Sequence, residues 1–155
     1  MPVIESSLVY VMRDDEVLML HRVKKKNDIH EGKWNGLGGK SEKGESPAEC
    51  AIREVKEESG LIMNRVHFSG HITFPDFDGV NDWSVFIFTA DDFSGEVIEC
   101  DEGNLFWKKK NEIMDLNLWP GDRAFLPLVM SGTLFSGKIT YDQGKLVEVD
   151  LQKIT

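Results

Sequence analysis

Three glutamates in one predicted helix are the strongest candidates for chemistry in this sequence. Glu54, Glu57 and Glu58 are spaced i, i+3 and i+4, so a helix places their carboxylates on one face, within reach of a single centre. Like charges at this spacing repel one another unless a cation lies among them. Carboxylate oxygens without histidine or cysteine suit a hard cation such as Mg²⁺, which bridges carboxylates to substrate phosphates. The cluster predicts a metal-dependent enzyme for a phosphate ester or anhydride; the alternative is a solvated acidic helix face.

The helix that carries these glutamates has clear signals at both ends. Ser46 and Pro47 fit the N-cap and the first helical position, and Glu49 occupies the capping-box position. Gly60 is placed to end the helix in a left-handed conformation. The sequence therefore predicts a helix between Ser46 and Gly60.

The rest of the chain alternates apolar strand-like segments with turn signals, without repeats or long linkers. Strands mixed with two separated helices predict an α/β or α+β sandwich around a mixed sheet, formed as one domain over residues 1–155. A second helix is expected over 123–130. The expected strands are 7–12 and 17–21, paired as a hairpin, then a short strand or bend at 34–39, followed by 66–74, 83–90, 104–108, 134–141 and 146–151.

Composition excludes several classes of protein. The 155 residues carry a formal net charge of −9, and the nine acidic residues between Val66 and Trp107 are accompanied by no lysine or arginine. Such a surface disfavours a nucleic acid polymer as partner. No apolar run approaches the ~20 residues that span a bilayer, and no signal peptide is evident. Cys50 and Cys100 form no CxxC pair. We therefore expect a cytoplasmic protein with free thiols and no membrane partner, of unknown oligomeric state.

The glutamate helix lies within a longer pattern of fixed residues. This pattern spans residues 39–61. Each specified polar or glycine residue is expected by chance at about 5–7% of positions, so the probability that this chain matches the whole pattern by chance is on the order of one in ten million. The segment 39–61 resembles the Nudix box, so the chain resembles the Nudix hydrolase family. The matching positions are Gly39, Glu45, Arg53, Glu54, Val55, Glu57, Glu58, Gly60 and Leu61.

This resemblance implies a Nudix fold, an α/β/α sandwich around a mixed β-sheet. It also implies hydrolysis of a nucleoside diphosphate linked to another group, with Mg²⁺ as cofactor and Mn²⁺ as a substitute. Arg53 would orient the glutamates of the helix. The general base is left open between Glu57, Glu58 and the later pair Asp101-Glu102, which by itself is typical of a turn. The implied metal ligands are the Gly39 carbonyl, Glu54, Glu57, Glu58 and Glu102.

A further resemblance, to the MutT-type subgroup that hydrolyses oxidised purine nucleoside triphosphates, extends over nearly the whole chain. Its anchors are WNGLGGK at 34–40, the acidic pair at 101–102 with Trp107, and LWPGD at 118–122, all with the spacing of the subgroup. The resemblance implies hydrolysis of a substrate such as 8-oxo-dGTP to the monophosphate and pyrophosphate, as a sanitation of the nucleotide pool.

The same resemblance implies a set of substrate-binding residues. Asn35, Trp119 and Asp122 are the candidates for base recognition, since an amide can bond a purine edge and an indole offers a stacking face. The candidate for a second aromatic wall is Phe74, although both aromatic residues could simply pack in the core. Lys25 is a candidate phosphate contact, with a solvated loop as the alternative. Beside these, Gly121 replaces an acidic residue of the subgroup, which puts the preference for 8-oxoguanine in question.

Two other functions remain open from the sequence. The substrate could be a dinucleoside polyphosphate or ADP-ribose, because the fold and the box do not determine the leaving group. A catalytically silent nucleotide sensor is a further alternative, and the intact glutamates argue against it.

Overall fold

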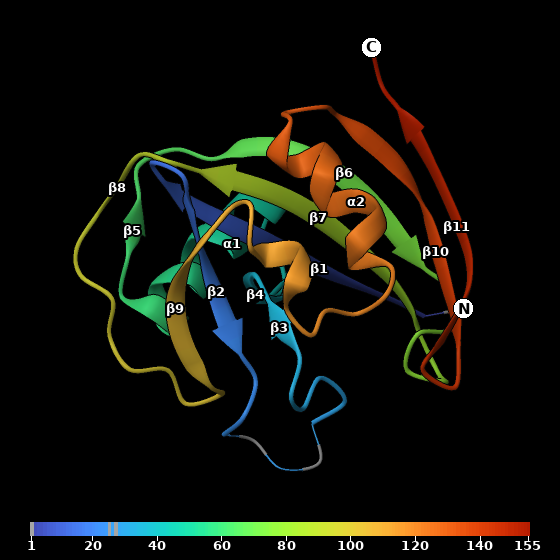
Figure 1. Ribbon diagram of the computed structural model, residues 1–155. Helices are drawn as coiled ribbons and strands as arrows, with labels where there is room; N and C mark the ends of the chain where they lie inside the picture. Colours follow the sequence, from blue (N-terminus) through green and yellow to red (C-terminus); the bar gives the residue numbers. More distant parts are fainter. Residues whose placement is uncertain (1, 25, 27) are drawn as a thin grey trace.

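The structure, a computed structural model, describes residues 2–24, 26 and 28–155 (Figure 1). Most of its strands belong to one large mixed sheet, and two α-helices accompany that sheet. The elements are β1 (Val3–Arg13), β2 (Glu16–His21), β3 (Trp34–Asn35), β4 (Leu37–Lys40), α1 (Pro47–Ser59), β5 (Ile62–Met63), β6 (His67–Phe74), β7 (Asp82–Ala90), β8 (Phe93–Ser94), β9 (Asn104–Lys109), η1 (Ile113–Asp115), α2 (Asp122–Met130), β10 (Phe135–Asp142) and β11 (Lys145–Lys153).

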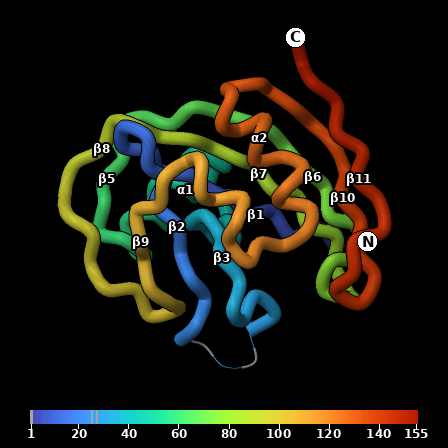
Figure 2. Tube along the Cα trace, viewed as in Figure 1, coloured from blue at the N-terminus to red at the C-terminus, as the bar shows by residue number. Residues whose placement is uncertain are grey.

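The large sheet has the strand order β11-β10-β6-β7-β1-β2-β3, with β4 paired to β1 and β9 paired to β2. The β1–β7 and β10–β6 pairs are parallel, and the other pairs in this sheet are antiparallel. β1 is therefore antiparallel to β2 and β4 and parallel to β7. Its pairing with β4, which leads into α1, places the start of that helix next to the middle of the sheet. In the Cα trace, β2, from early in the sequence, lies beside β9, from the second half of the chain (Figure 2).

Alternate residues of β1 pack on opposite faces of the sheet, as the two-residue period of a strand requires. Val9 and Val11 lie in a buried cluster with residues of α1, whereas Tyr10 lies in a second buried cluster with residues of α2. The two helices thus cover opposite faces. This arrangement confirms the expected α/β/α sandwich around a mixed sheet.

Most of the expected elements are present, with shifted ends. The hairpin of β1 and β2 forms, but β1 begins at Val3 instead of residue 7. The predicted second helix is α2, which contains Pro127 and begins one residue earlier than expected. The two-residue strands β5 and β8 were not predicted, because so short a segment has no periodic signal. Among the described residues, no helix is long and apolar enough to cross a membrane.

Candidate active site

Helix α1 is held at its start by its cap and along one side by strand β4. Ser46 Oγ accepts the N–H of Glu49 at 3.1 Å, and the Glu49 carboxylate accepts the N–H of Ser46 at 2.9 Å, which completes the predicted capping box. Farther along, the Gly38 N–H donates to Glu58 Oε1 at 2.8 Å. Glu58 is therefore buried against β4, whereas Glu57, one residue before it, is exposed.

The backbone of β4 lies close to the side chain of Glu54 at Gly39. A Cβ atom at this position would lie 2.5 Å from the carboxylate carbon of Glu54, with both carboxylate oxygens within 2.7 Å. The Gly39 carbonyl accepts the thiol hydrogen of Cys50 at an S···O distance of 3.4 Å. Glycine is therefore required here by the space that the Glu54 carboxylate fills.

Substitution of Gly39 by alanine is expected to displace the Glu54 carboxylate. We expect a rise of about tenfold in the Mg²⁺ concentration needed for half-maximal activity. The matched control is Gly44→Ala in the following loop, where a Cβ atom meets nothing within 4 Å but φ is +80°. The control should lower the midpoint of thermal unfolding and leave the Mg²⁺ dependence intact. Equal Mg²⁺ dependence in all three proteins would contradict the proposed role of Gly39.

Arg53 joins the loop before α1 to two of the glutamates. Its Nε and Nη2 donate to the Glu45 carboxylate at 2.7 and 2.9 Å, and Nη1 donates to Glu54 at 2.8 Å and to Glu57 at 3.2 Å. Its Nη2 also donates to the Lys40 carbonyl at 3.0 Å. The hydrogen bond from Arg53 is the main reason that the pKa of Glu45 falls to about 2. Arg53 thus contacts two of the helix glutamates that it is expected to orient.

The carboxylates near α1 affect one another's protonation. Burial, opposed by the Gly38 hydrogen bond and reinforced by Glu102 and Glu54, raises the pKa of Glu58 to about 8. Burial also raises the pKa of Glu54, against the opposing effect of Arg53. Glu102, which follows β8 in the chain, thus lies close enough to act on both glutamates. Of the acidic pair at 101–102, Glu102 therefore lies near the helix glutamates.

The donor set of this cluster fits a divalent cation. Among the described residues, no three acidic, imidazole or thiol groups are already gathered as a metal-binding arrangement. Arg53 instead binds Glu54 and Glu57, and the Gly38 N–H binds Glu58. A cation bound by oxygen ligands alone would favour the charged form of Glu58, against the burial and the neighbouring carboxylates that raise its pKa. Arg53 would then serve to orient the ligands.

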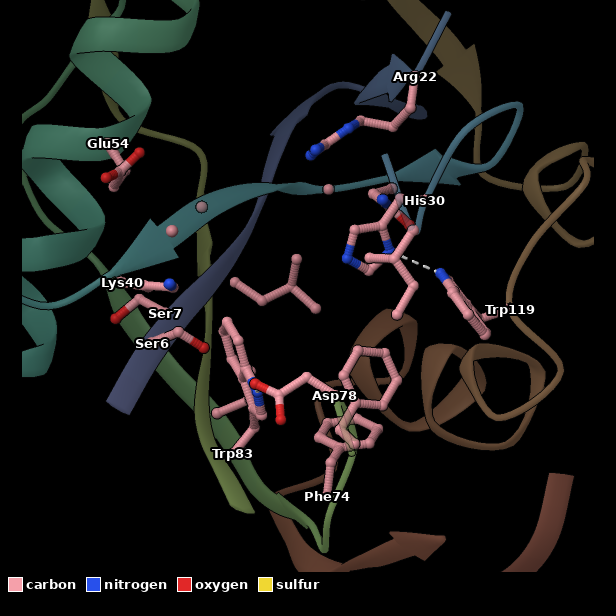
Figure 3. A pocket seen from close by; sticks show the side chains of 18 of the residues that line it. Ser6, Ser7, Arg22, His30, Lys40, Glu54, Phe74, Asp78, Trp83 and Trp119 are labelled. Carbon is pink, nitrogen blue, oxygen red and sulfur yellow. Dashed lines mark hydrogen bonds between the residues drawn. The ribbon is translucent and has the colours of Figure 1, made fainter. Parts of the chain in front are cut away.

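A cavity of about 620 Å³ begins at this cluster and continues along the sheet, within the volume range of small-molecule sites (Figure 3). Glu57 and Glu58 are not among the residues that line it. The predicted site residues that do line the cavity are Asn35, Gly39, Arg53, Glu54, Phe74, Glu102, Trp119 and Asp122. Carboxylates at one end therefore share a single cavity with the base-recognition candidates. Lys25 lies outside the described residues.

Phe74 and Trp119 satisfy both interpretations that the sequence left open. Trp119 belongs to the buried core cluster on the α2 side, and Phe74 packs against that cluster while partly exposed. Both side chains also line the cavity. The aromatic core and the cavity wall are thus the same surface in this part of the molecule.

Asp122, the first residue of α2, is partly exposed at the cavity. Burial raises its pKa to about 7, although Lys33 and Arg123 act in the opposite direction. A carboxyl group with such a pKa exists in both protonation states near neutral pH. It is therefore able to donate or to accept a hydrogen bond.

Gly121 faces the hydroxyl of Tyr141. The Gly121 N–H donates to Tyr141 Oη at 2.7 Å, and a Cβ atom at position 121 would lie 2.7 Å from that oxygen and 2.8 Å from a methyl carbon of Ile139. The missing acidic side chain therefore does not leave an empty space. The phenol of Tyr141, which also lines the cavity, fills it.

Sequence reasoning missed several residues that line the cavity. Arg22 is a cation at its edge, where Nη2 lies 2.7 Å from Asp28 and Nη1 lies 3.3 Å from Glu102. Its position directly after an apolar strand was an available signal. His30 and Trp83 also line the cavity, and neither belongs to a motif that predicts this position.

A mixed sheet between two helices, with a glutamate-bearing helix at one end of a cavity, is the arrangement of a Nudix hydrolase. The NUDIX domain model matches residues 4–129, and the chain belongs to the Nudix hydrolase family. Members act on phosphoric anhydrides of small nucleotides and generally require a divalent metal ion.

Individual proteins show the same likeness. The mouse (Mus musculus) oxidized purine nucleoside triphosphate hydrolase is 34% identical over 149 residues, which cover 96% of this chain and 94% of the mouse protein. An ADP-ribose pyrophosphatase of Methanocaldococcus jannaschii is 32% identical over 110 residues, which cover 71% of this chain and 60% of the archaeal protein. The crystal structure of a mutator MutT protein from Bacillus halodurans superposes with a TM-score of 0.85 at 30% identity, covering 96% of this chain and 97% of that one.

Proposed function

We propose that this protein hydrolyses a purine nucleoside triphosphate to the monophosphate and pyrophosphate with Mg²⁺, and that an oxidised purine such as 8-oxo-dGTP is its preferred substrate. The observation that carries the proposal is the shared cavity. Glu54 and Glu102 line it together with the base-recognition candidates Asn35, Trp119 and Asp122. Glu54 and Trp119 lie on opposite sides of this cavity (Figure 3). The mouse relative that covers nearly the whole chain is named for this class of substrate.

At the proposed phosphate end, the protein supplies carboxylate oxygens that the Arg53 guanidinium holds in place. A divalent ion bound there would neutralise phosphate charge, polarise phosphoryl oxygens and lower the pKa of a bound water. Arg53 fixes the carboxylates of Glu54 and Glu57 through one guanidinium group. Glu57, Glu58 and Glu102 are the candidates to accept the proton of the attacking water. Arg22, at the edge of this region, would pair with phosphate oxygens.

At the proposed base end, Asn35 and Asp122 would read the edge of the purine while Trp119 contacts its face. The raised pKa of Asp122 allows the neutral carboxyl to donate a hydrogen bond to a carbonyl oxygen of the base. Tyr141 provides a hydroxyl beside Gly121, where the subgroup carries an acidic residue.

The raised pKa of Asp122 gives a stability prediction. The folded protein keeps this proton up to about pH 7, whereas the unfolded chain releases it near pH 3.8, so the free energy of unfolding falls as pH rises through this window. Asn cannot ionise, so the Asp122→Asn variant should gain thermal stability relative to the natural protein between pH 5 and pH 8. Thermal unfolding of both proteins at the two pH values tests this. A difference in unfolding midpoint that is the same at both values would contradict it.

A nucleotide panel with product identification tests the proposed reaction. The expected result is a higher kcat/KM for 8-oxo-dGTP than for dGTP, with monophosphate and pyrophosphate as the products. Release of orthophosphate alone would contradict the proposed cleavage. Variants at Asn35, Trp119 and Asp122 should change the ratio of kcat/KM values between these nucleotides, and unchanged selectivity in all three would remove them from the proposed pocket.

The second candidate is hydrolysis of ADP-ribose or a dinucleoside polyphosphate. The archaeal relative named as an ADP-ribose pyrophosphatase favours this alternative, although it matches a smaller share of the chain. The same panel, extended by these two compounds, discriminates between the candidates. A preference for either compound over every nucleoside triphosphate would replace the first proposal.

A further inference from the structure

The loop that carries His30 is fastened to the cavity rim at several points. Asp28 Oδ2 accepts from Arg22 Nε at 2.9 Å, and Asp28 Oδ1 accepts the backbone N–H of His30 at 3.2 Å. Farther along the loop, the Gly32 N–H donates to the Arg22 carbonyl at 2.7 Å, and the Gly32 carbonyl accepts from Asn117 Nδ2 at 3.0 Å. The backbone around His30 is thus attached to two other segments.

The imidazole ring of His30 is fixed by two aromatic neighbours. Trp119 Nε1 donates a hydrogen bond to His30 Nδ1 at 2.7 Å, and the two rings meet edge to face with centroids 5.5 Å apart. Phe77 stacks on the imidazole at a centroid distance of 6.1 Å and an interplanar angle of 22°. The orientation of the ring is therefore determined by the protein.

This hydrogen bond also determines which nitrogen of His30 carries the proton. An indole N–H is a donor only, so Nδ1 must accept and cannot be protonated. A neutral imidazole then has its single proton on Nε2. Burial and the nearby Arg22 lower the pKa of His30 to about 4, against the opposing effect of Asp28 and Glu102. His30 is therefore neutral at physiological pH, as a donor at Nε2.

Nε2 of His30 points toward the cavity, on the side of the ring away from Trp119 (Figure 3). Among the described residues, none forms a hydrogen bond with this nitrogen. A half-buried donor without a protein partner destabilises the folded protein unless water or a ligand accepts its hydrogen. The cavity thus presents a donor of fixed position and fixed protonation.

We propose that His30 is a specificity-determining residue whose Nε2–H donates a hydrogen bond to an acceptor on the base of the bound nucleotide. This inference rests on the proposed function insofar as it requires a nucleobase in the cavity. A purine offers ring nitrogens and exocyclic carbonyl oxygens as acceptors. The bond to Trp119 couples the group that reads the edge of the base to the ring proposed to contact its face.

Two substitutions distinguish the role of the Nε2–H of His30 from that of its hydrogen bond with Trp119. In His30→Asn, the amide oxygen can take the place of Nδ1 and accept from Trp119, but nothing extends to the position of Nε2. In His30→Gln, the longer amide can bring an N–H to the position of Nε2. We expect His30→Asn to lower kcat/KM for the best nucleotide by about tenfold, the effect of one lost hydrogen bond, and His30→Gln to retain most of it.

Nucleotides that lack one acceptor provide the decisive measurement. The probes are dGTP, 7-deaza-dGTP, which lacks N7, and the 2-aminopurine deoxynucleoside triphosphate, which lacks O6. In the natural protein, one analogue should be disfavoured against dGTP by about tenfold. That penalty should disappear in His30→Asn and persist in His30→Gln. Equal unfolding midpoints and Mg²⁺ dependence would separate this effect from a loss of structure.

The outcomes that overturn the proposal are distinct from those that overturn the proposed function. If the ratios of kcat/KM among these three nucleotides and 8-oxo-dGTP are the same in the natural protein and in His30→Asn, His30 does not read the base. If the natural protein instead prefers ADP-ribose, the proposed function fails. The test then compares ADP-ribose with its 7-deazaadenine analogue in the same variants, and equal ratios again overturn the role of His30.

Discussion

Replacing Glu57 by glutamine is expected to lower kcat by at least about 100-fold, because a neutral amide would hold the divalent cation less well than a carboxylate does. The side chain of Glu57 is 59% exposed and contacts Arg53 at 3.2 Å, so the fold does not depend on it. A large loss of rate would therefore be a loss of chemistry. Initial rates at saturating Mg²⁺, together with the thermal unfolding midpoint, provide the measurement.

The matched control for this variant lies on the same helix. Glu49→Gln removes the same charge, and glutamine can still accept the Ser46 N–H of the capping box. This variant should keep nearly the full rate. If Glu57→Gln also retains most of its rate under saturating Mg²⁺, Glu57 is not essential.

Replacing Arg53 by lysine is expected to raise the Mg²⁺ concentration for half-maximal activity by about 10- to 100-fold and to lower kcat/KM. A guanidinium group reaches Glu45, Glu54 and Glu57 at once, whereas a single ammonium group cannot hold the same geometry. The charge is retained in this variant, so its effect reports the loss of orientation.

Two further measurements identify Arg53 as a positioning residue. Excess Mg²⁺ should restore part of the kcat of Arg53→Lys, since the ligands themselves are intact. Glu45→Gln, which keeps an oxygen acceptor for Arg53 while removing a charge, should have a smaller effect. An Arg53→Lys protein with normal Mg²⁺ dependence would show that the orientation of Glu54 and Glu57 does not limit activity.

The part of the site that depends on local sequence could be predicted well. The ends of α1 follow from Ser46, Pro47 and Gly60, each of which acts within one helical turn, and the box glutamates follow from their spacing on that helix. The strand pairs were less accessible. β5 and β8 are two residues long and are stabilised by contacts between distant segments, which a single sequence does not reveal.

The meeting of Arg22 with Glu102 illustrates what the sequence could not show. β2 pairs with β9, which places His21 opposite Asn104, and the residues beyond these ends then converge at the cavity. This convergence results from sheet register between segments some 80 positions apart in the chain. Lys25 was the phosphate contact suggested by the sequence, whereas the described basic residues that line the cavity are Arg22, Lys40 and Arg53.

Because Gly121 and Tyr141 are in contact, a substitution at one of these positions affects which residues the other can accept. An acidic side chain at 121 would collide with the phenol oxygen, and removing that oxygen would leave the Gly121 N–H without its partner. Neither change is favourable alone, whereas the two together exchange a hydroxyl for a carboxylate at the same place. We therefore expect homologous sequences that carry an acidic residue at position 121 to carry a different residue at position 141 as well.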